Sequence, residues 1–166
     1  MFAAHGIPRF GTEVVRDYLT KHRDAYKFLH DQTVKLMNNG LTPTEIAEQL
    51  VLPTALAREW YNRGYYGTMS HNAKAIYQRY IGWYDANPVN LNPLPPVAAG
   101  THYVEAMGGA DAVLAKADAA VKGGEYRWAS MMLNHLVFAD PRNDAARNKL
   151  ADVYTELAFQ IGRAHV

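Results

Sequence analysis

The sequence predicts an all-α protein, a helical bundle that contains tetratricopeptide-like helix hairpins and no β-sheet. Apolar side chains recur at helical spacing through long stretches, as they do over residues 12–38. Glycine pairs and prolines separate these stretches, as is typical of loops between helices. No segment shows the apolar–polar alternation of a half-buried strand.

The first helices have clear start and stop signals. Residues 12–38 are expected to form one long helix, which Asn38-Asn39-Gly40 ends with a left-handed turn. A second helix is expected after Thr42. Pro43 suits the first helical position, and Glu45 completes a capping box with Thr42.

Two shorter helices are expected to follow. Pro53 begins the third, which runs to about Asn62. Gly64 to Gly67 then break the pattern. Ser70 is the expected cap of a fourth helix that continues to about Tyr84 and presents an aromatic face.

A proline-rich stretch at residues 87–96 is the expected boundary between two sub-lobes. Its four prolines disfavour a helix and favour extended, polyproline-like geometry. We therefore expect an extended connector between sub-lobes at about 12–86 and 97–160.

The second sub-lobe is expected to contain four helices. Their expected ranges are about 97–107, 110–122, 125–139 and 143–160. Small residues at crossing points and large ones between them make the last two resemble a tetratricopeptide-type hairpin. A single hairpin needs a further surface to pack on, which would be the preceding helices or a second chain.

Composition excludes several classes of function. The net charge of +1 gives no reason to expect a nucleic-acid partner. The chain has no cysteine, which excludes disulfides and a cysteine-type zinc site. No apolar run is long enough to predict a membrane span, and the first residues do not form a secretory signal.

Both ends of the chain are expected to be atypical. It begins in a His-Gly-Ile-Pro loop with no element before it. Residues 161–166 match what a common sequencing-adapter DNA encodes in one reading frame. We therefore expect a non-native tail there and leave it out of the fold prediction.

The most informative block runs from Gly64 to Pro88, GYYGTMSHNAKAIYQRYIGWYDANP. Together with the later block GGADAVLAKA it resembles the bacterial alkylsulfatase family. The resemblance implies that residues 1–11 are the end of a metallo-β-lactamase-fold zinc hydrolase domain. It also implies that residues 12–160 are the helical dimerisation domain of such an enzyme, and that the chain forms a homodimer.

The resemblance further implies what the parent enzyme does. It would hydrolyse alkyl sulfate esters, such as dodecyl sulfate, to an alcohol and sulfate at a dinuclear zinc site. The present chain alone is expected to hold no zinc and to be inactive, since the other metal ligands of the family are missing. The compartment stays undetermined, although a bacterial periplasmic or secreted parent fits the family.

The same resemblance assigns candidate site residues. His5 matches a zinc-ligand position, whereas Gly6 departs from the second histidine that is usual there. His71 is the candidate catalytic residue, and Asn72 lies beside it as a sulfate ligand. The alternative role of His71 is to cap and pack the aromatic helix.

The remaining sulfate-binding candidates are Lys35, Tyr66 and Tyr80. Lys35 stands where the family often has arginine, although a solvated helix face explains it as well. Both tyrosines could donate hydrogen bonds to a sulfate group, but aromatic residues at helical spacing commonly form core.

Two other functions compete with the dimerisation domain. A stand-alone tetratricopeptide-like scaffold that binds a peptide or protein would explain the hairpin, but not the Ser70-His71-Asn72 triplet. A chain that hydrolyses sulfate esters by itself would need metal ligands that the family signature supplies and this sequence lacks.

Overall fold

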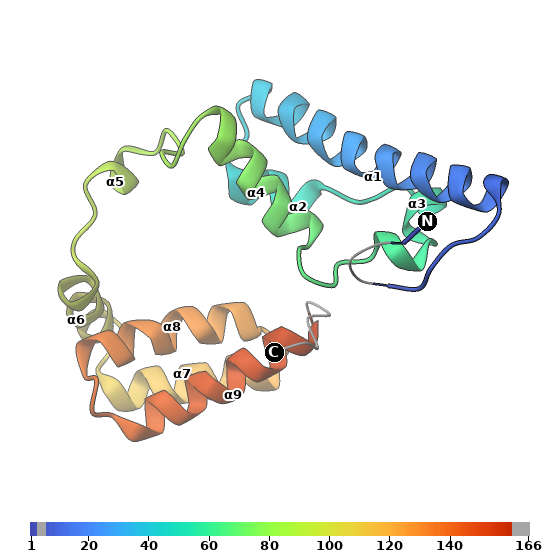
Figure 1. The fold of residues 1–166 in the computed structure, drawn as a ribbon. Helices are drawn as coiled ribbons and strands as arrows, with labels where there is room; N and C mark the ends of the chain where they lie inside the picture. Colours follow the sequence, from blue (N-terminus) through green and yellow to red (C-terminus); the bar gives the residue numbers. More distant parts are fainter. Residues whose placement is uncertain (3–5, 161–166) are drawn as a thin grey trace. The chain divides into compact units, whose positions relative to one another are not determined.

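The computed structural model describes residues 1–2 and 6–160. All regular structure in these residues is helical and no strand occurs among them, so the all-α prediction is confirmed. The chain divides into two compact units, the first from Met1 to Asn90 and the second from Leu91 onward. Figure 1 shows the helices of each unit. The tetratricopeptide-like detail stays a prediction.

Unit 1 is built on α1 (Thr12–Asn38) and α2 (Pro43–Gln49). Helix α1 has the predicted bounds, and α2 begins where predicted. Gly40 adopts a left-handed φ of 85° after α1, which glycine accepts without steric cost. The Thr42 side chain accepts a hydrogen bond from the Glu45 N–H, and the Glu45 carboxylate accepts one from the Thr42 N–H, which completes the capping box. These bonds lower the pKa of Glu45.

The prediction of one continuous third helix is wrong. The structure has a short helix α3 (Thr54–Ala57) and a separate 3₁₀ turn η1 (Trp60–Asn62). Glu59 lies between them with an extended backbone, and its carboxylate accepts a 2.6 Å hydrogen bond from Lys21 Nζ of α1. This ion pair spans 38 residues, so a local sequence pattern does not show it.

The fourth helix, α4 (Met69–Tyr80), differs from its prediction at both ends. Thr68 caps it instead of Ser70, because the Thr68 hydroxyl accepts the His71 N–H at 3.1 Å. The helix ends at Tyr80 and not at Tyr84, since Gly82 takes a left-handed φ of 103°.

The core of unit 1 lies where α1, α2 and α4 meet. One buried polar group there, the Thr33 hydroxyl, donates 2.7 Å to the Leu29 carbonyl and is therefore satisfied. The buried apolar members of this core are Leu29, Ile46, Leu50, Ala73 and Tyr77. Their packing sets the position of α4 relative to α1.

The connector is not wholly extended as predicted. It contains a short helix α5 (Pro88–Leu91). Pro88 occupies the first helical position, where its missing N–H costs no hydrogen bond. The Asn87 side chain accepts a hydrogen bond from the Val89 N–H at 3.2 Å. This local cap stabilises the helical turn, although prolines generally disfavour a helix.

Unit 2 has the four predicted helices. They are α6 (Pro96–Ala106), α7 (Ala110–Lys122), α8 (Tyr126–Ala139) and α9 (Asp144–Gln160), each within one residue of its predicted ends. In Figure 1, α8 and α9 run side by side in opposite directions. The buried core of this unit comprises Val113, Ala117, Ala120, Ala129, Met132, Leu133, Leu136, Ala146, Leu150 and Val153.

One glycine decides how closely α6 approaches α8. A Cβ on Gly100 would lie 2.6 Å from the His135 carbonyl oxygen and 3.2 Å from the Ala139 nitrogen. Both are backbone atoms of α8. The close crossing therefore requires a residue without a side chain.

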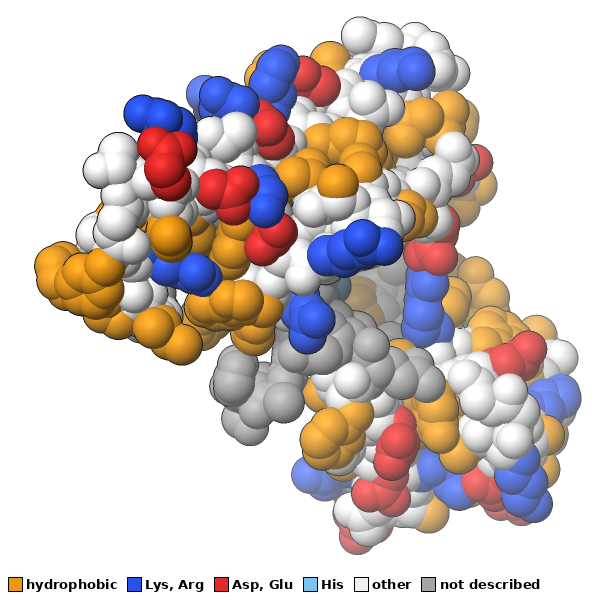
Figure 2. Space-filling model, turned by 90° about the vertical axis from the view of Figure 1, so that its right-hand side faces the viewer, with side chains coloured by type: hydrophobic (Ala, Val, Ile, Leu, Met, Phe, Trp, Pro, Cys, Tyr) orange, Lys and Arg blue, Asp and Glu red, His pale blue; other side chains and the backbone are white. Residues whose placement is uncertain are grey.

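The surface carries charges of both signs. On the face in Figure 2, basic and acidic side chains are interspersed with hydrophobic ones. Among the described residues, no helix is both long enough and apolar enough to cross a membrane.

Candidate functional site

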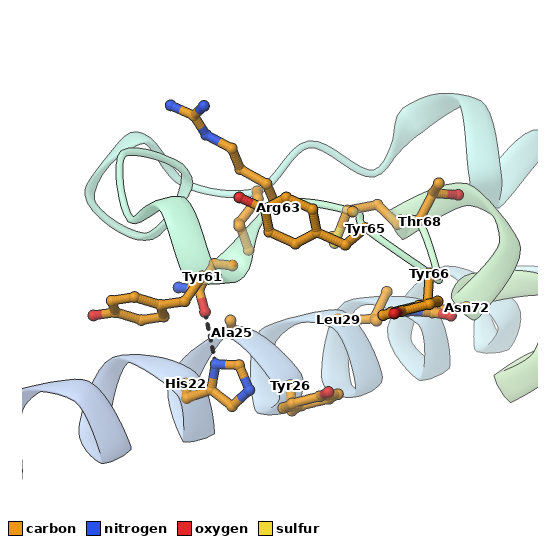
Figure 3. A pocket seen from close by; sticks show the side chains of 15 residues that line it. His22, Ala25, Tyr26, Leu29, Tyr61, Arg63, Tyr65, Tyr66, Thr68 and Asn72 are labelled. Atoms are coloured by element: carbon orange, nitrogen blue, oxygen red, sulfur yellow. Dashed lines mark hydrogen bonds between the residues drawn. The ribbon is translucent and has the colours of Figure 1, made fainter. Parts of the chain in front are cut away.

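A pocket of about 250 Å³ lies in unit 1 between α1, the loop after η1 and the start of α4. In Figure 3, His22 and Tyr26 project from α1, while Tyr65 comes from the loop opposite. The predicted sulfate ligands Tyr66 and Asn72 both line this pocket. The structure therefore brings together two of the predicted site residues.

Two glycines shape the loop that forms one wall of the pocket. A Cβ on Gly67 would lie 2.7 Å from Asn72 Oδ1, and one on Gly64 would lie 2.6 Å from the Gly67 carbonyl oxygen. The loop can therefore pack directly on the Asn72 side chain only because both positions lack a side chain. This contact holds the amide at the edge of the pocket.

His22 and Asn62 add a polar pair that the sequence analysis missed. Asn62 Nδ2 donates to the Leu56 carbonyl at 3.1 Å, which leaves Asn62 Oδ1 as the acceptor toward His22 Nδ1 at 3.1 Å. His22 Nδ1 therefore carries the proton in this pair, and in the neutral ring Nε2 is an acceptor. The dashed line in Figure 3 marks this contact.

The aromatic rings around His22 make one wall of the pocket rigid. His22 stacks on Tyr18 with ring centroids 5.3 Å apart and meets the edge of Tyr26 at 5.2 Å. Burial, followed by the negative charge of Glu59, raises the pKa of the neighbouring Tyr61 hydroxyl. The Tyr61 hydroxyl also hydrogen-bonds to Glu59.

Arg9 ties the N-terminal segment to this aromatic wall. Its guanidinium carbon lies 5.2 Å from the ring centroids of Tyr18, Trp60 and Tyr61. Arg9 Nη2 is buried and has no hydrogen-bond partner among the described residues. The predicted zinc ligand His5 precedes Arg9 and lies outside the described residues.

Tyr80 and Lys35 belong to a second cluster, at a groove near the C-terminal end of α1. Asp31 Oδ1 lies 3.0 Å from His30 Nδ1, and the Tyr80 hydroxyl lies 2.8 Å from His30 Nε2. Because a carboxylate only accepts, His30 Nδ1 donates to Asp31, and in the neutral ring Nε2 is the acceptor toward the Tyr80 hydroxyl. Lys27 and then His30 lower the pKa of Asp31. Lys35 lines the same groove.

His71 lies outside both clusters. It is exposed in the first turn of α4, and its imidazole makes no hydrogen bond within the described part of the chain. Asn72 is the next residue but turns about 100° around the helix axis, which is why only Asn72 faces the pocket. The catalytic role of His71 stays a prediction.

A family model for alkyl sulfatase dimerisation matches residues 42–166. The chain belongs to the alkyl sulfatase dimerisation family. It is 54% identical over 160 residues to the alkyl/aryl-sulfatase BDS1 of Saccharomyces cerevisiae, and 53% identical over 161 residues to an (R)-specific secondary-alkylsulfatase of Pseudomonas sp.. These alignments cover 96% of this chain but only 25% and 24% of the two relatives.

A solved structure is similar along almost the same length. The stereoselective inverting sec-alkylsulfatase Pisa1 from Pseudomonas sp. superposes with a TM-score of 0.89 at 55% identity, over 92% of this chain and 24% of that protein. The chain thus spans about a quarter of the alkylsulfatases that it matches. The stand-alone scaffold alternative receives no support from these comparisons.

The described residues do not form a metal site by themselves. Within residues 1–2 and 6–160, no three His, Cys, Asp or Glu side chains are grouped so that they could hold a metal ion. A tetrahedral zinc site needs at least three protein ligands.

Proposed function

We propose that this chain is the homodimerisation domain of an alkyl sulfatase whose whole protein hydrolyses alkyl sulfate esters to an alcohol and sulfate. The match of the dimerisation family model to residues 42–166 carries the proposal. Identity near 54% to two sulfatases supports the same activity class. The domain would comprise residues 12–160, with residues 1–11 as the end of the hydrolase domain. By the same resemblance, a dinuclear zinc site belongs to the rest of the protein.

Self-association is the first expected result. The purified chain should have the mass of a dimer in light scattering, and that mass should stay constant on dilution. Many large aromatic and aliphatic side chains are exposed on the described residues, which is typical of a surface that a partner covers. A monomer mass at every concentration would contradict the proposal.

We further propose that Asn72 and Tyr66 form the edge of the sulfate site. An alkyl sulfate needs hydrogen-bond donors around its oxygens, and the Asn72 amide and the Tyr66 hydroxyl are donors of this kind. Tyr26, Leu29 and Leu52 also line this pocket, and their apolar surface suits the first carbons of an alkyl chain. His71, Lys35 and Tyr80 do not line this pocket. Any contact of theirs with the sulfate group would have to come from outside it.

A chimera tests this assignment. This chain would replace the matching quarter of the (R)-specific secondary-alkylsulfatase, and sulfate release from a secondary alkyl sulfate would be measured. We expect Asn72→Ala to lower kcat/KM about 100-fold, which is the usual effect of removing one preorganised donor. The exposed Asn148→Ala on α9 is the matched control and should leave kcat/KM unchanged. Equal activity of both variants would exclude Asn72 from the site.

A further inference from the structure

One face of α8 is unusually apolar for a surface helix. Trp128, Met131, His135 and Phe138 follow the spacing i, i+3, i+7 and i+10, which places them in one stripe along the helix. Trp128 is 49% exposed, Met131 57% and Phe138 39%. We call these four residues the α8 stripe.

Helices α8 and α6 contain few charged residues. Between Tyr126 and Ala139 the sequence has a single charged residue, Arg127, and α6 has only Glu105. The other two helices of unit 2 differ. Their charged residues are Asp111, Lys116, Asp118 and Lys122 on α7, and Asp144, Arg147, Lys149, Asp152 and Glu156 on α9. Exposed Trp, Met and Phe on helices with few charged residues are the composition of an interface centre.

Helix α6 widens this surface. The Tyr103 ring lies 4.2 Å from the His135 ring, and Tyr103 is itself more than half exposed. A groove of about 550 Å³ runs beside Trp128, with Tyr103 and Met107 in its lining and with Lys116 and Glu125 as its charged members. The apolar surface therefore extends from the α8 stripe onto α6 and includes a recess that can receive a side chain.

The spacing of the α8 stripe fits a second copy of this chain as its partner. The α8 stripe is symmetric about Leu133, because Trp128 and Phe138 lie five residues on either side of it and Met131 and His135 lie two residues on either side. A two-fold axis at this point pairs the helix with itself in antiparallel orientation. Such a pairing sets Met131 against the partner's His135, and Trp128 against the partner's Phe138.

We infer that two copies of this chain pair through the α8 stripe, with the two α8 helices antiparallel about Leu133 and with Tyr103 at the edge. The inference rests on the proposed homodimerisation. Covering Tyr103, Trp128, Met131 and Phe138 would bury on the order of 100 Å² each, since whole aromatic side chains bury 150–250 Å². That is about half of the roughly 800 Å² that each partner buries in a stable interface, and the rims of α6 and α8 would supply the rest.

Charge placed in the stripe tests this interface. We expect Met131→Glu to weaken the dimer by at least about 30-fold in dissociation constant, measured by sedimentation and light scattering, because a charge would be buried without a partner. The helix content should not change, since Met131 is exposed within one chain. Two equally drastic changes elsewhere serve as controls, Tyr154→Glu on α9 and Trp83→Glu in unit 1, at side chains 51% and 70% exposed. Both should remain dimers.

A mixing experiment tests the antiparallel arrangement. The Met131→Glu chain and a His135→Lys chain should each pair weakly alone, yet form a heterodimer when mixed. In that heterodimer the introduced carboxylate faces the introduced ammonium group across the two-fold axis.

The outcomes separate the inference from the function on which it rests. A monomeric wild-type chain would contradict the proposed homodimerisation itself. A wild-type dimer that persists in Met131→Glu, or that dissociates in Trp83→Glu instead, would overturn the α8 stripe as the interface. Failure of the mixed chains to pair would overturn the antiparallel register.

Discussion

Replacing Ile46 with alanine should destabilise unit 1 by about 3 kcal/mol, within the range of 2–5 kcal/mol for large-to-small changes at buried sites. Ile46 has no exposed surface and lies among the side chains that join α2 to α1 and α4. Truncation removes apolar area and leaves a cavity that rigid helices cannot close. Denaturant unfolding followed by hydrogen exchange should show the loss.

The pattern of exchange makes this prediction specific. Because contacts divide the chain at Asn90, protection should fall in α1, α2 and α4, while the helices of unit 2 keep theirs. Ile81→Ala is the matched control, since Ile81 is 51% exposed. We expect that variant to change stability by less than about 0.5 kcal/mol. Equal losses in both variants would show that Ile46 is not a core residue.

Replacing Gly100 with alanine should destabilise unit 2 by about 2 kcal/mol. In a helix interior, alanine is ordinarily about 1 kcal/mol more favourable than glycine. Here the new Cβ would meet the His135 carbonyl at 2.6 Å, so α6 must move away from α8 or the backbone must distort. Overpacking of this kind costs about 1–3 kcal/mol, or more where the neighbour is backbone.

Whether Gly100→Ala raises or lowers the unfolding stability distinguishes helix propensity from the steric clash. Gly123→Ala is the control, because Gly123 has an ordinary φ of −83° and its new Cβ would come no closer than 3.5 Å to any neighbour. That variant should be close to neutral by the same unfolding measurement. If Gly100→Ala raised the unfolding midpoint, helix propensity would outweigh the clash and the close crossing of α6 and α8 would be wrong.

The helices were predictable because their signals are local. Apolar spacing and flanking glycines or prolines located α1, α2 and the four helices of unit 2. The predicted helix bounds are wrong where a contact with a distant residue or a competing capping side chain determines the end of a helix. The Lys21–Glu59 ion pair accompanies the break between α3 and η1, and Thr68 caps α4 where Ser70 had been expected.

The candidate site was predictable only in part, for a related reason. Tyr66 and Asn72 are six residues apart, so one loop and one helix turn can bring them together. His22 and Asn62 are separated by 40 residues, and no local pattern shows that they meet. The spacing of Tyr18, His22 and Tyr26 at i, i+4 and i+8 would have indicated an aromatic face on α1.

By itself, the sequence determined the all-helical class, most helix bounds and the family resemblance, because each depends on residues close together in the chain. Tertiary structure alone decided which side chains share a surface. It separated Asn72 from His71, placed Tyr80 on His30, and left the α8 stripe exposed on unit 2. Those outcomes depend on how helices rotate and cross, which follows from core packing over the whole unit and not from any single segment.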